Sequence, residues 1–350
     1  MPKKNSRDLG DSPGSSDQPT APLKYGVNHL LAIAIDDYDT IRKLSNCKKD
    51  VDDITDILTT KYTFSKDNVK KLYDQEATSE NIIAALDHYA GFVKEEDTLT
   101  ILFSGHGENR NEIGFWIPVN ATINKFNEYL SLSTVSDFLE PIKARHIFII
   151  SDACYSGLLF KKTTRSLDNS GAAERDPSRY ALTAGRNQKV SDGVPGDNSP
   201  FAEAIKKHLV NHEDDLLGVV TLSQQVLLEV DKMTKKGQTP RHSELDIRGN
   251  KSGQFYFHLK KGLDAEAHVQ IGKLMIHLAE KVQDPAIYRS ALKHFEYAAT
   301  QSRFSSIPLP EIQYWQGKAL YGAGDYKTAI ACFSRFLDDH SSHFPTAHIR

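Results

Sequence analysis

Three short segments composed almost wholly of apolar residues limit what this chain can fold into. They are residues 30–35 (LLAIAI), 99–103 (LTILF) and 147–150 (IFII). Such segments are typical of strands in a parallel sheet, because helices cover both faces of that sheet. Between them, apolar residues recur every three or four positions around residues 51–58 and 82–93, the spacing of a buried helix face. This alternation of strand and helix predicts a doubly wound α/β domain.

The same alternation continues further along the chain. We predict a strand at residues 180–184, helices at residues 201–210 and 222–233, and a last strand at residues 255–259. Residues 158–178 are rich in Asn, Ser, Gly, Asp and Pro, and they predict a long exposed loop. A loop of about 20 residues is uncommon inside a compact domain unless it has a function.

The part of the chain after Gly262 has a different character. Strand signals end there, and residues 263–350 predict helical hairpins. Residues in the last hairpin have the spacing of a tetratricopeptide repeat, in which small residues let paired helices approach each other and aromatic residues fill the space between them. They are Gly317, Ala319, Gly324, Asp325, Tyr326, Ala329, Ile330 and Phe333. Two hairpins are fewer than a stable array usually needs, so the helices either pack against the α/β domain or belong to a longer array.

Composition argues against several classes of function. The 350 residues include 43 Lys and Arg against 46 Asp and Glu, a net charge of −3, which argues against a polybasic surface for nucleic acid or anionic membranes. The three cysteines form no CxxC pair, which argues against disulfides or a thiolate zinc site. No segment is apolar over the roughly 18 residues that cross a bilayer. We expect a cytoplasmic protein without nucleic-acid or membrane partners, whose polar residues 1–24 form a flexible leader.

One histidine and one cysteine follow two of the predicted strands directly. His106 lies in Ser104-Gly105-His106-Gly107 after the second apolar segment, and Cys154 lies in SDACYSG after the third. In open α/β sheets the active site lies at the carboxyl ends of the strands. Two adjacent parallel strands would bring the imidazole and the thiol within several ångströms of each other. Such a pair can act as general base and nucleophile.

These two motifs, with the strands around them, resemble the caspase-like cysteine peptidases and most of all the metacaspase branch. The resemblance covers residues 28–259, including the strand after the long loop and Gln238-Thr239-Pro240 before the last strand. It implies a sheet of about six mostly parallel strands flanked by helices, within a peptidase domain at residues 28–261. It also implies a dyad of His106 and Cys154, with the backbone N–H groups of Cys154 and Gly107 stabilising the oxyanion.

The resemblance also implies a substrate pocket. Metacaspases line this pocket with residues that match Asp50, Asp152, Cys47 and Ser104 here. Two carboxylates in a narrow pocket favour a buried Lys or Arg side chain, because a substrate cation offsets their repulsion and desolvation. We therefore expect cleavage after Arg or Lys. An alternative role for Asp50 is that of an acid at the start of a helix.

The predicted loop carries several basic residues that match this preference: Lys161, Lys162, Arg165, Arg175 and Arg179. In the family, the corresponding loop joins the two portions of the catalytic domain and is often cut by the enzyme itself or by another protease. Basic residues are also common in solvated loops, so self-processing and a purely structural role both remain open.

Many metacaspases bind calcium through clustered aspartates after the His and shortly after the Cys. This chain has ENRNEIG at residues 108–114 and two lysines soon after Cys154. A hard divalent cation requires several oxygen ligands. We therefore predict no metal site, no cofactor and calcium-independent activity.

Taken together, these features predict a cysteine endopeptidase that acts on proteins and is controlled by loop cleavage or by a partner on the helical repeats, either an activator or a substrate. Two alternatives remain. The chain could be a catalytically silent scaffold that works through its repeats, or a peptidase that cuts after Asn or Asp. The presence of both His106 and Cys154, with acidic pocket candidates, argues against the scaffold.

Overall fold

The central feature of the fold is a six-stranded sheet. The computed structural model describes residues 23–111, 113–154, 174–185, 193–235, 237–301 and 306–340. The strand order is β10-β8-β7-β3-β1-β2, and every neighbouring pair is parallel except β8 with β10. The strands are β1 (Asn28–Ala34), β2 (Val69–Tyr73), β3 (Thr98–Ser104), β7 (His146–Asp152), β8 (Ser178–Thr183) and β10 (Arg241–Glu244).

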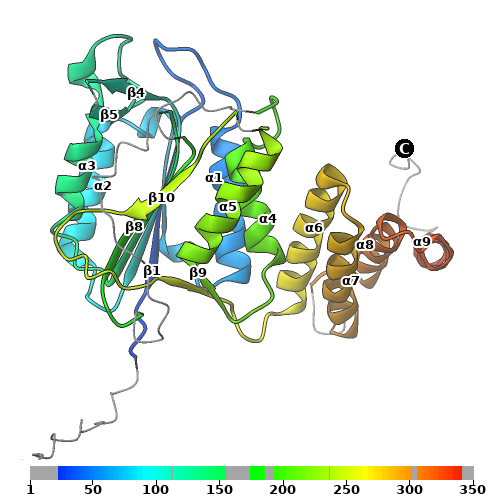
Figure 1. Ribbon diagram of the computed structural model, residues 1–350. Helices are drawn as coiled ribbons and strands as arrows, with labels where there is room; N and C mark the ends of the chain where they lie inside the picture. The colour runs from blue at the N-terminus through cyan, green and yellow to red at the C-terminus, as the bar shows by residue number, and fades with distance from the viewer. Residues whose placement is uncertain are drawn as a thin grey trace, which may run out of the picture.

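Helices cover both faces of this sheet, as Figure 1 shows. One face packs against α1 (Cys47–Lys61), α4 (Pro200–Asn211) and α5 (Val219–Met233). The other face packs against α2 (Ser79–Phe92) and α3 (Leu132–Leu139). Successive residues of β1 alternate between the two cores, which explains why an uninterrupted apolar segment was needed there. The predicted α/β fold, a mostly parallel sheet flanked by helices, is therefore confirmed.

One strand prediction requires correction, and one strand was not predicted. The predicted last strand is β11 (Tyr256–His258), but it pairs with β9 (Leu216–Gly218) in a separate two-stranded sheet. The antiparallel edge of the main sheet is instead β10, whose sequence is RHSE. An edge strand that is only partly buried does not require an apolar segment, so the apolar pattern did not reveal it.

A small three-stranded sheet follows β3. It consists of β4 (Gly107–Arg110), β5 (Ile113–Trp116) and β6 (Leu130–Ser131). The ENRNEIG segment forms much of the β4–β5 hairpin, so this segment is backbone-paired over most of its described length. In the described part of the α/β domain there are also three short 3₁₀ helices: Lys66–Asn68, Asp74–Glu76 and Phe126–Glu128.

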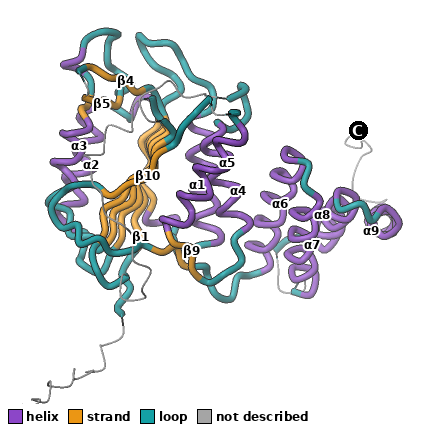
Figure 2. The backbone as a smooth tube through the Cα atoms, viewed as in Figure 1, coloured by secondary structure: helices purple, strands orange, loops and turns teal. Residues whose placement is uncertain are grey.

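The C-terminal part consists of two helical hairpins that pack directly on the α/β domain. They are formed by α6 (Ala265–Val282) with α7 (Pro285–Thr300) and by α8 (Leu309–Gly322) with α9 (Tyr326–His340). Helix α6 lies beside α1 and α4, which it contacts (Figure 2). The buried residues of α6 to α8 continue the core on that face of the sheet. A Cβ atom at Gly317 would lie 2.6 Å from the Phe333 ring, so glycine is what allows α8 and α9 to approach. Their identity as tetratricopeptide repeats stays a prediction.

At the carboxyl end of the predicted exposed loop, the structure differs from the prediction. Lys161, Lys162 and Arg165 lie outside the described residues, as does nearly all of the predicted leader, and Arg175 is exposed. Arg179, however, belongs to strand β8 and is only 3% exposed, so its assignment to an exposed loop was wrong. Its guanidinium donates hydrogen bonds to the backbone carbonyl groups of Ile142, Arg145 and Ser178. A buried arginine with such partners serves the fold and is not accessible to a protease.

Among the described residues, none of the helices combines the length and the apolar composition that crossing a bilayer requires.

Candidate active site

The register between β3 and β7 places His106 and Cys154 at the same edge of the sheet. Ser104 is opposite Asp152, so both candidate residues lie two positions beyond a matched pair. The backbone N–H of Gly105 still donates to the carbonyl of Asp152 at 3.2 Å, so the two segments remain side by side past the strand ends. The structure thus places the two predicted catalytic residues on adjacent segments.

The backbone of His106 is held on both sides. Its N–H donates to the hydroxyl of Tyr38 at 2.7 Å, and its carbonyl accepts from the N–H of Ile117 at 3.0 Å. The Tyr38 hydroxyl in turn donates to the carbonyl of Ile117 at 3.1 Å. Burial raises the pKa of Tyr38 well above its usual range, so this hydroxyl keeps its proton. Sequence analysis missed Tyr38, because nothing in its local spacing indicates a contact 68 residues away.

The His106 ring also has a defined orientation. Its Nε2 atom lies 2.7 Å from the backbone carbonyl oxygen of Arg42. A carbonyl oxygen can only accept a hydrogen bond, so in the neutral ring Nε2 carries the proton and Nδ1 has the lone pair. The ring is therefore in the tautomer whose Nδ1 can accept a proton from a thiol. Sequence analysis missed this contact too, because any residue at position 42 offers the same carbonyl group.

Gly107 lies against the backbone of Cys154. A Cβ atom at position 107 would come within 2.1 Å of the Cys154 carbonyl oxygen, so only glycine allows this approach. Gly107 is opposite Trp116 in the β4–β5 ladder. The neighbouring pair, His106 and Ile117, is hydrogen-bonded through the Ile117 N–H and the His106 carbonyl. Bonded and non-bonded pairs alternate along an antiparallel ladder, so the Gly107 N–H points away from β5. In that direction, the Gly107 N–H can donate a hydrogen bond to a ligand instead of to a residue of β5.

Trp116 fastens the β4–β5 hairpin to the central sheet. Its ring stacks on Phe103 of β3, with centroids 4.2 Å apart. Its Nε1 donates to the Ser151 hydroxyl of β7 at 3.0 Å. These contacts fix the hairpin to both strands that lead to His106 and Cys154.

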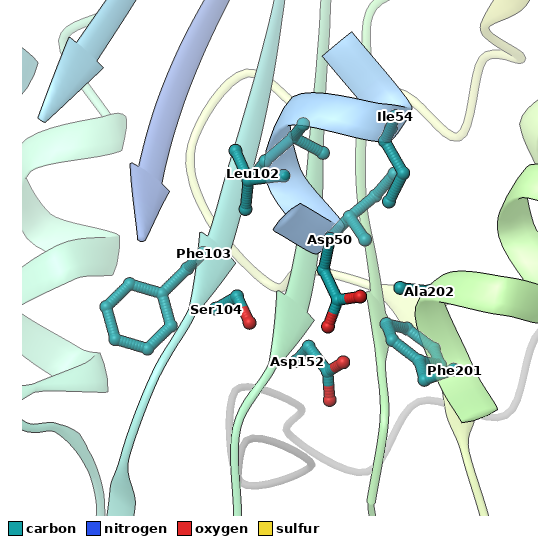
Figure 3. Close-up of a pocket in the computed structure, with 10 residues that line it drawn as sticks. Asp50, Ile54, Leu102, Phe103, Ser104, Asp152, Phe201 and Ala202 are labelled. Carbon is teal, nitrogen blue, oxygen red and sulfur yellow. The ribbon is translucent and has the colours of Figure 1, made fainter. Parts of the chain in front are cut away.

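Next to these residues, two carboxylates converge on a small cavity, as Figure 3 shows. Asp50 comes from the first turn of α1, Asp152 from the end of β7 and Ser104 from the end of β3. The cavity has a volume of about 10 Å³, enough for about one water molecule. Three of the four predicted pocket residues line it. Cys47 instead lies buried in the core at the start of α1.

Residues that sequence analysis did not select form hydrogen bonds with the two carboxylates. The Ser199 hydroxyl donates to Asp152 at 2.5 Å, and its backbone N–H donates to Asp50 at 3.1 Å. The Asn198 side chain donates to Asp50 at 2.8 Å. Burial, and then the charge of Asp152, raise the pKa of Asp50 well above its usual range. Ser199 caps α4 and precedes a proline, and this helix-start signal can be recognised in the sequence. The contacts of Ser199 with the carboxylates cannot be recognised there.

The start of α1 is positioned from outside the helix. Asp36, just after β1, accepts from the backbone N–H groups of Cys47 and Lys48 at 2.8 and 3.3 Å. This carboxylate satisfies donors that a helix N-terminus leaves without partners. Asp50 does lie in the first turn of α1, as the alternative proposed, and its carboxylate accepts hydrogen bonds from Asn198 and Ser199.

Within the described parts of the chain, no group of three His, Cys, Asp or Glu side chains is arranged to hold a metal ion.

Comparisons with known proteins identify the family of this chain. The sequence matches the family described as "Caspase domain" over residues 28–252. It is 37% identical over 109 residues to Metacaspase-1 from Plasmodium falciparum (isolate 3D7), covering 29% of this chain and 18% of the relative. It is 28% identical over 163 residues to Metacaspase-6 from Arabidopsis thaliana, covering 42% of each chain. The chain thus spans less than half the length of these relatives.

Solved structures similar to this one include protein GSU0716 from Geobacter sulfurreducens and pro-sf-caspase-1. The first has a TM-score of 0.47 and 14% identity, covering 65% of this chain and 99% of the other. The second has a TM-score of 0.42 and 13% identity, covering 69% and 96%. Because the "Caspase domain" match covers well over half of the sequence, this chain belongs to the caspase-domain family of cysteine peptidases.

Proposed function

We propose that this chain is a cysteine endopeptidase that cleaves proteins after Arg or Lys, with His106 and Cys154 as its catalytic dyad. The observation that carries the specificity is the convergence of Asp50 and Asp152 on one cavity beside the end of β3. Two carboxylates so close together repel each other, and a cation between them removes that repulsion. The metacaspase names of its relatives agree with this class of enzyme.

The contacts of His106 and Gly107 support a defined sequence of steps. Nδ1 of His106 takes the thiol proton of Cys154, and Sγ attacks the carbonyl carbon of the scissile bond. The carbonyl oxygen becomes an oxyanion that the N–H groups of Gly107 and Cys154 stabilise. When the C–N bond breaks, the imidazolium gives its proton to the leaving amine and a thioester remains. Water then hydrolyses the thioester, with His106 accepting the proton from water.

Substrate binding requires the pocket to open. A cavity of about 10 Å³ cannot take a Lys or Arg side chain, since it has room for about one water molecule. In the closed pocket, neutral donor groups of Asn198 and Ser199 form hydrogen bonds to the two carboxylates. A substrate cation would replace them with stronger, charge-assisted hydrogen bonds. Binding of a basic side chain thus offsets the loss of the closed arrangement.

Control of this activity is a further part of the proposal. Lys161, Lys162 and Arg165 are the candidate processing positions that lie outside the described residues, and Arg175 is the exposed one within them. The C-terminal helices would bind the activator or the substrate. Intact mass spectrometry of the wild type beside Cys154→Ala separates self-cleavage from cleavage by another protease, because only self-cleavage is lost in the variant.

The experiment that tests specificity uses four fluorogenic peptides that differ only in the last residue: Arg, Lys, Asn or Asp. We expect turnover of the Arg and Lys peptides by the wild type and none by Cys154→Ala. Preferred turnover of the Asn or Asp peptide would refute the specificity and favour the second alternative. Absence of Cys154-dependent turnover on all four, with the protein folded, would favour the silent scaffold.

A further inference from the structure

Residues 197–199, here called the closing segment, tie the substrate pocket to the C-terminal helices. Asn198 and Ser199 bond to the pocket carboxylates, as described above. Asp197 accepts a hydrogen bond from Lys281 of α6 at 2.6 Å. Helix α6 lies outside the region that matches the caspase domain. Three successive residues therefore connect α6, a helix of the C-terminal region, with the pocket carboxylates Asp50 and Asp152.

We propose that Lys281 is a positioning residue that holds the closing segment over the pocket, so that the C-terminal helices limit the access of basic side chains to Asp50 and Asp152. This inference rests on the proposed function. It concerns a residue that does not itself touch the pocket carboxylates.

The surroundings of Lys281 show why it stays in place. Its ammonium group also donates to Glu203 of α4 at 2.9 Å. Glu203 is only 2% exposed, and its Oε1 atom has no hydrogen-bond partner. The next cation, the Nζ of Lys206, lies 3.9 Å from the same carboxylate. A buried carboxylate needs a nearby cation, so Glu203 anchors Lys281 where it can reach Asp197.

The contacts within the closing segment transmit this restraint. Asp197 Oδ1 accepts from both Lys281 and the backbone N–H of Asn198, the latter at 2.9 Å. The Asn198 side chain donates to Asp53 as well as Asp50, and its carbonyl oxygen accepts from Lys206. Moving the closing segment as a unit away from the pocket breaks the contacts of Asn198 and Ser199 to α1 and the contact of Asp197 to α6.

The closing segment and a substrate cation compete for the same carboxylates. Loosening the segment should therefore favour substrate binding without changing the chemical step. The Lys281–Asp197 pair is partly exposed, with 30% and 44% of the side-chain surfaces accessible. A pair of this kind contributes up to about 1 kcal/mol, so its removal should lower the KM for an Arg peptide about two- to five-fold with kcat unchanged.

The test compares Lys281→Met and Asp197→Asn with Lys273→Met. Lys281→Met keeps the apolar stem of the side chain but leaves Glu203 without its nearest cation. Asp197→Asn is the gentler variant, because the amide oxygen can still accept from the Asn198 N–H. Lys273 lies on the same helix and pairs with Glu311 at 2.6 Å within the C-terminal region, so its variant is the matched control.

Two readouts separate this inference from the proposed function. Hydrogen exchange at residues 194–199, measured without substrate, should become faster in Lys281→Met and Asp197→Asn but not in Lys273→Met. Unchanged exchange in both variants overturns the inference, even if the wild type cleaves Arg peptides. A KM that is unchanged or raised in Asp197→Asn overturns it too. A wild type that cleaves none of the peptides overturns the proposed function, while exchange still decides whether Lys281 holds the segment.

Discussion

Replacing Gly107 with alanine would place a methyl group where the carbonyl oxygen of Cys154 now lies. The distance between the added carbon and that oxygen would be 2.1 Å, whereas carbon and oxygen atoms in contact stay about 3.3 Å apart. The two backbone segments must therefore separate by about 1 Å, since the contact is with backbone and not with a flexible side chain.

The expected cost follows from this displacement. The segments that separate carry His106 and Cys154, so the distance between base and nucleophile changes with them. A misplacement of about 1 Å lowers catalysis about 100-fold, which corresponds to about 2.7 kcal/mol in the activation barrier. The crowding itself should cost about 1–3 kcal/mol of stability, which a domain of this size can tolerate while remaining folded.

The assay measures kcat/KM on an Arg peptide together with thermal unfolding. Gly91→Ala is the matched control, because Gly91 is exposed in α2 and an added Cβ would have no neighbour within 4 Å. We expect this control to keep full activity and to gain about 0.5–1 kcal/mol of stability. A folded Gly107→Ala variant whose kcat/KM stays near that of the wild type would refute the close packing of Gly107 against Cys154 as a requirement for catalysis.

Three further predictions follow from the same site. Tyr38→Phe removes the hydroxyl that accepts from His106 and donates to Ile117, so unfolding should become easier by about 1–3 kcal/mol and kcat should fall; equal kcat in a folded variant would contradict the positioning role. Asp50→Asn should reduce kcat/KM for an Arg peptide about 10- to 100-fold through the loss of a charged hydrogen bond. The raised pKa of Asp50 means that the folded state binds its proton more tightly than the unfolded state, so this carboxyl lowers stability at pH values above its folded pKa. Asp50→Asn should thus unfold at a higher temperature than the wild type at neutral pH and gain less on acidification; a lower unfolding temperature at neutral pH would count against the burial of that charge. Finally, EDTA and added calcium should leave the rate on Arg peptides unchanged, and a calcium-dependent rate would refute the absence of a metal requirement.

The three apolar segments show which parts of the fold a local sequence pattern can predict. Each of β1, β3 and β7 is buried on both faces, so its apolar composition alone indicates a central strand of the sheet. The motifs directly after β3 and β7 could then be placed at one edge, because strand direction alone decides that position. Strand β10 and Arg179 could not be placed correctly, since a polar edge strand and a buried arginine both depend on partners distant in sequence.

The sequence by itself determined the α/β class, the helices of the C-terminal region, and the place of His106 and Cys154 directly after two strands of the sheet, whose pairing the structure then showed. Only the tertiary structure decided how these groups are supported and restrained. The Tyr38 hydroxyl and the Arg42 carbonyl reach His106 from 68 and 64 residues away, and Lys281 reaches Asp197 across 84. The physical reason is that burial gives residues a periodic pattern along the chain, whereas a hydrogen bond between distant segments requires only two suitable atoms and leaves no pattern at either position.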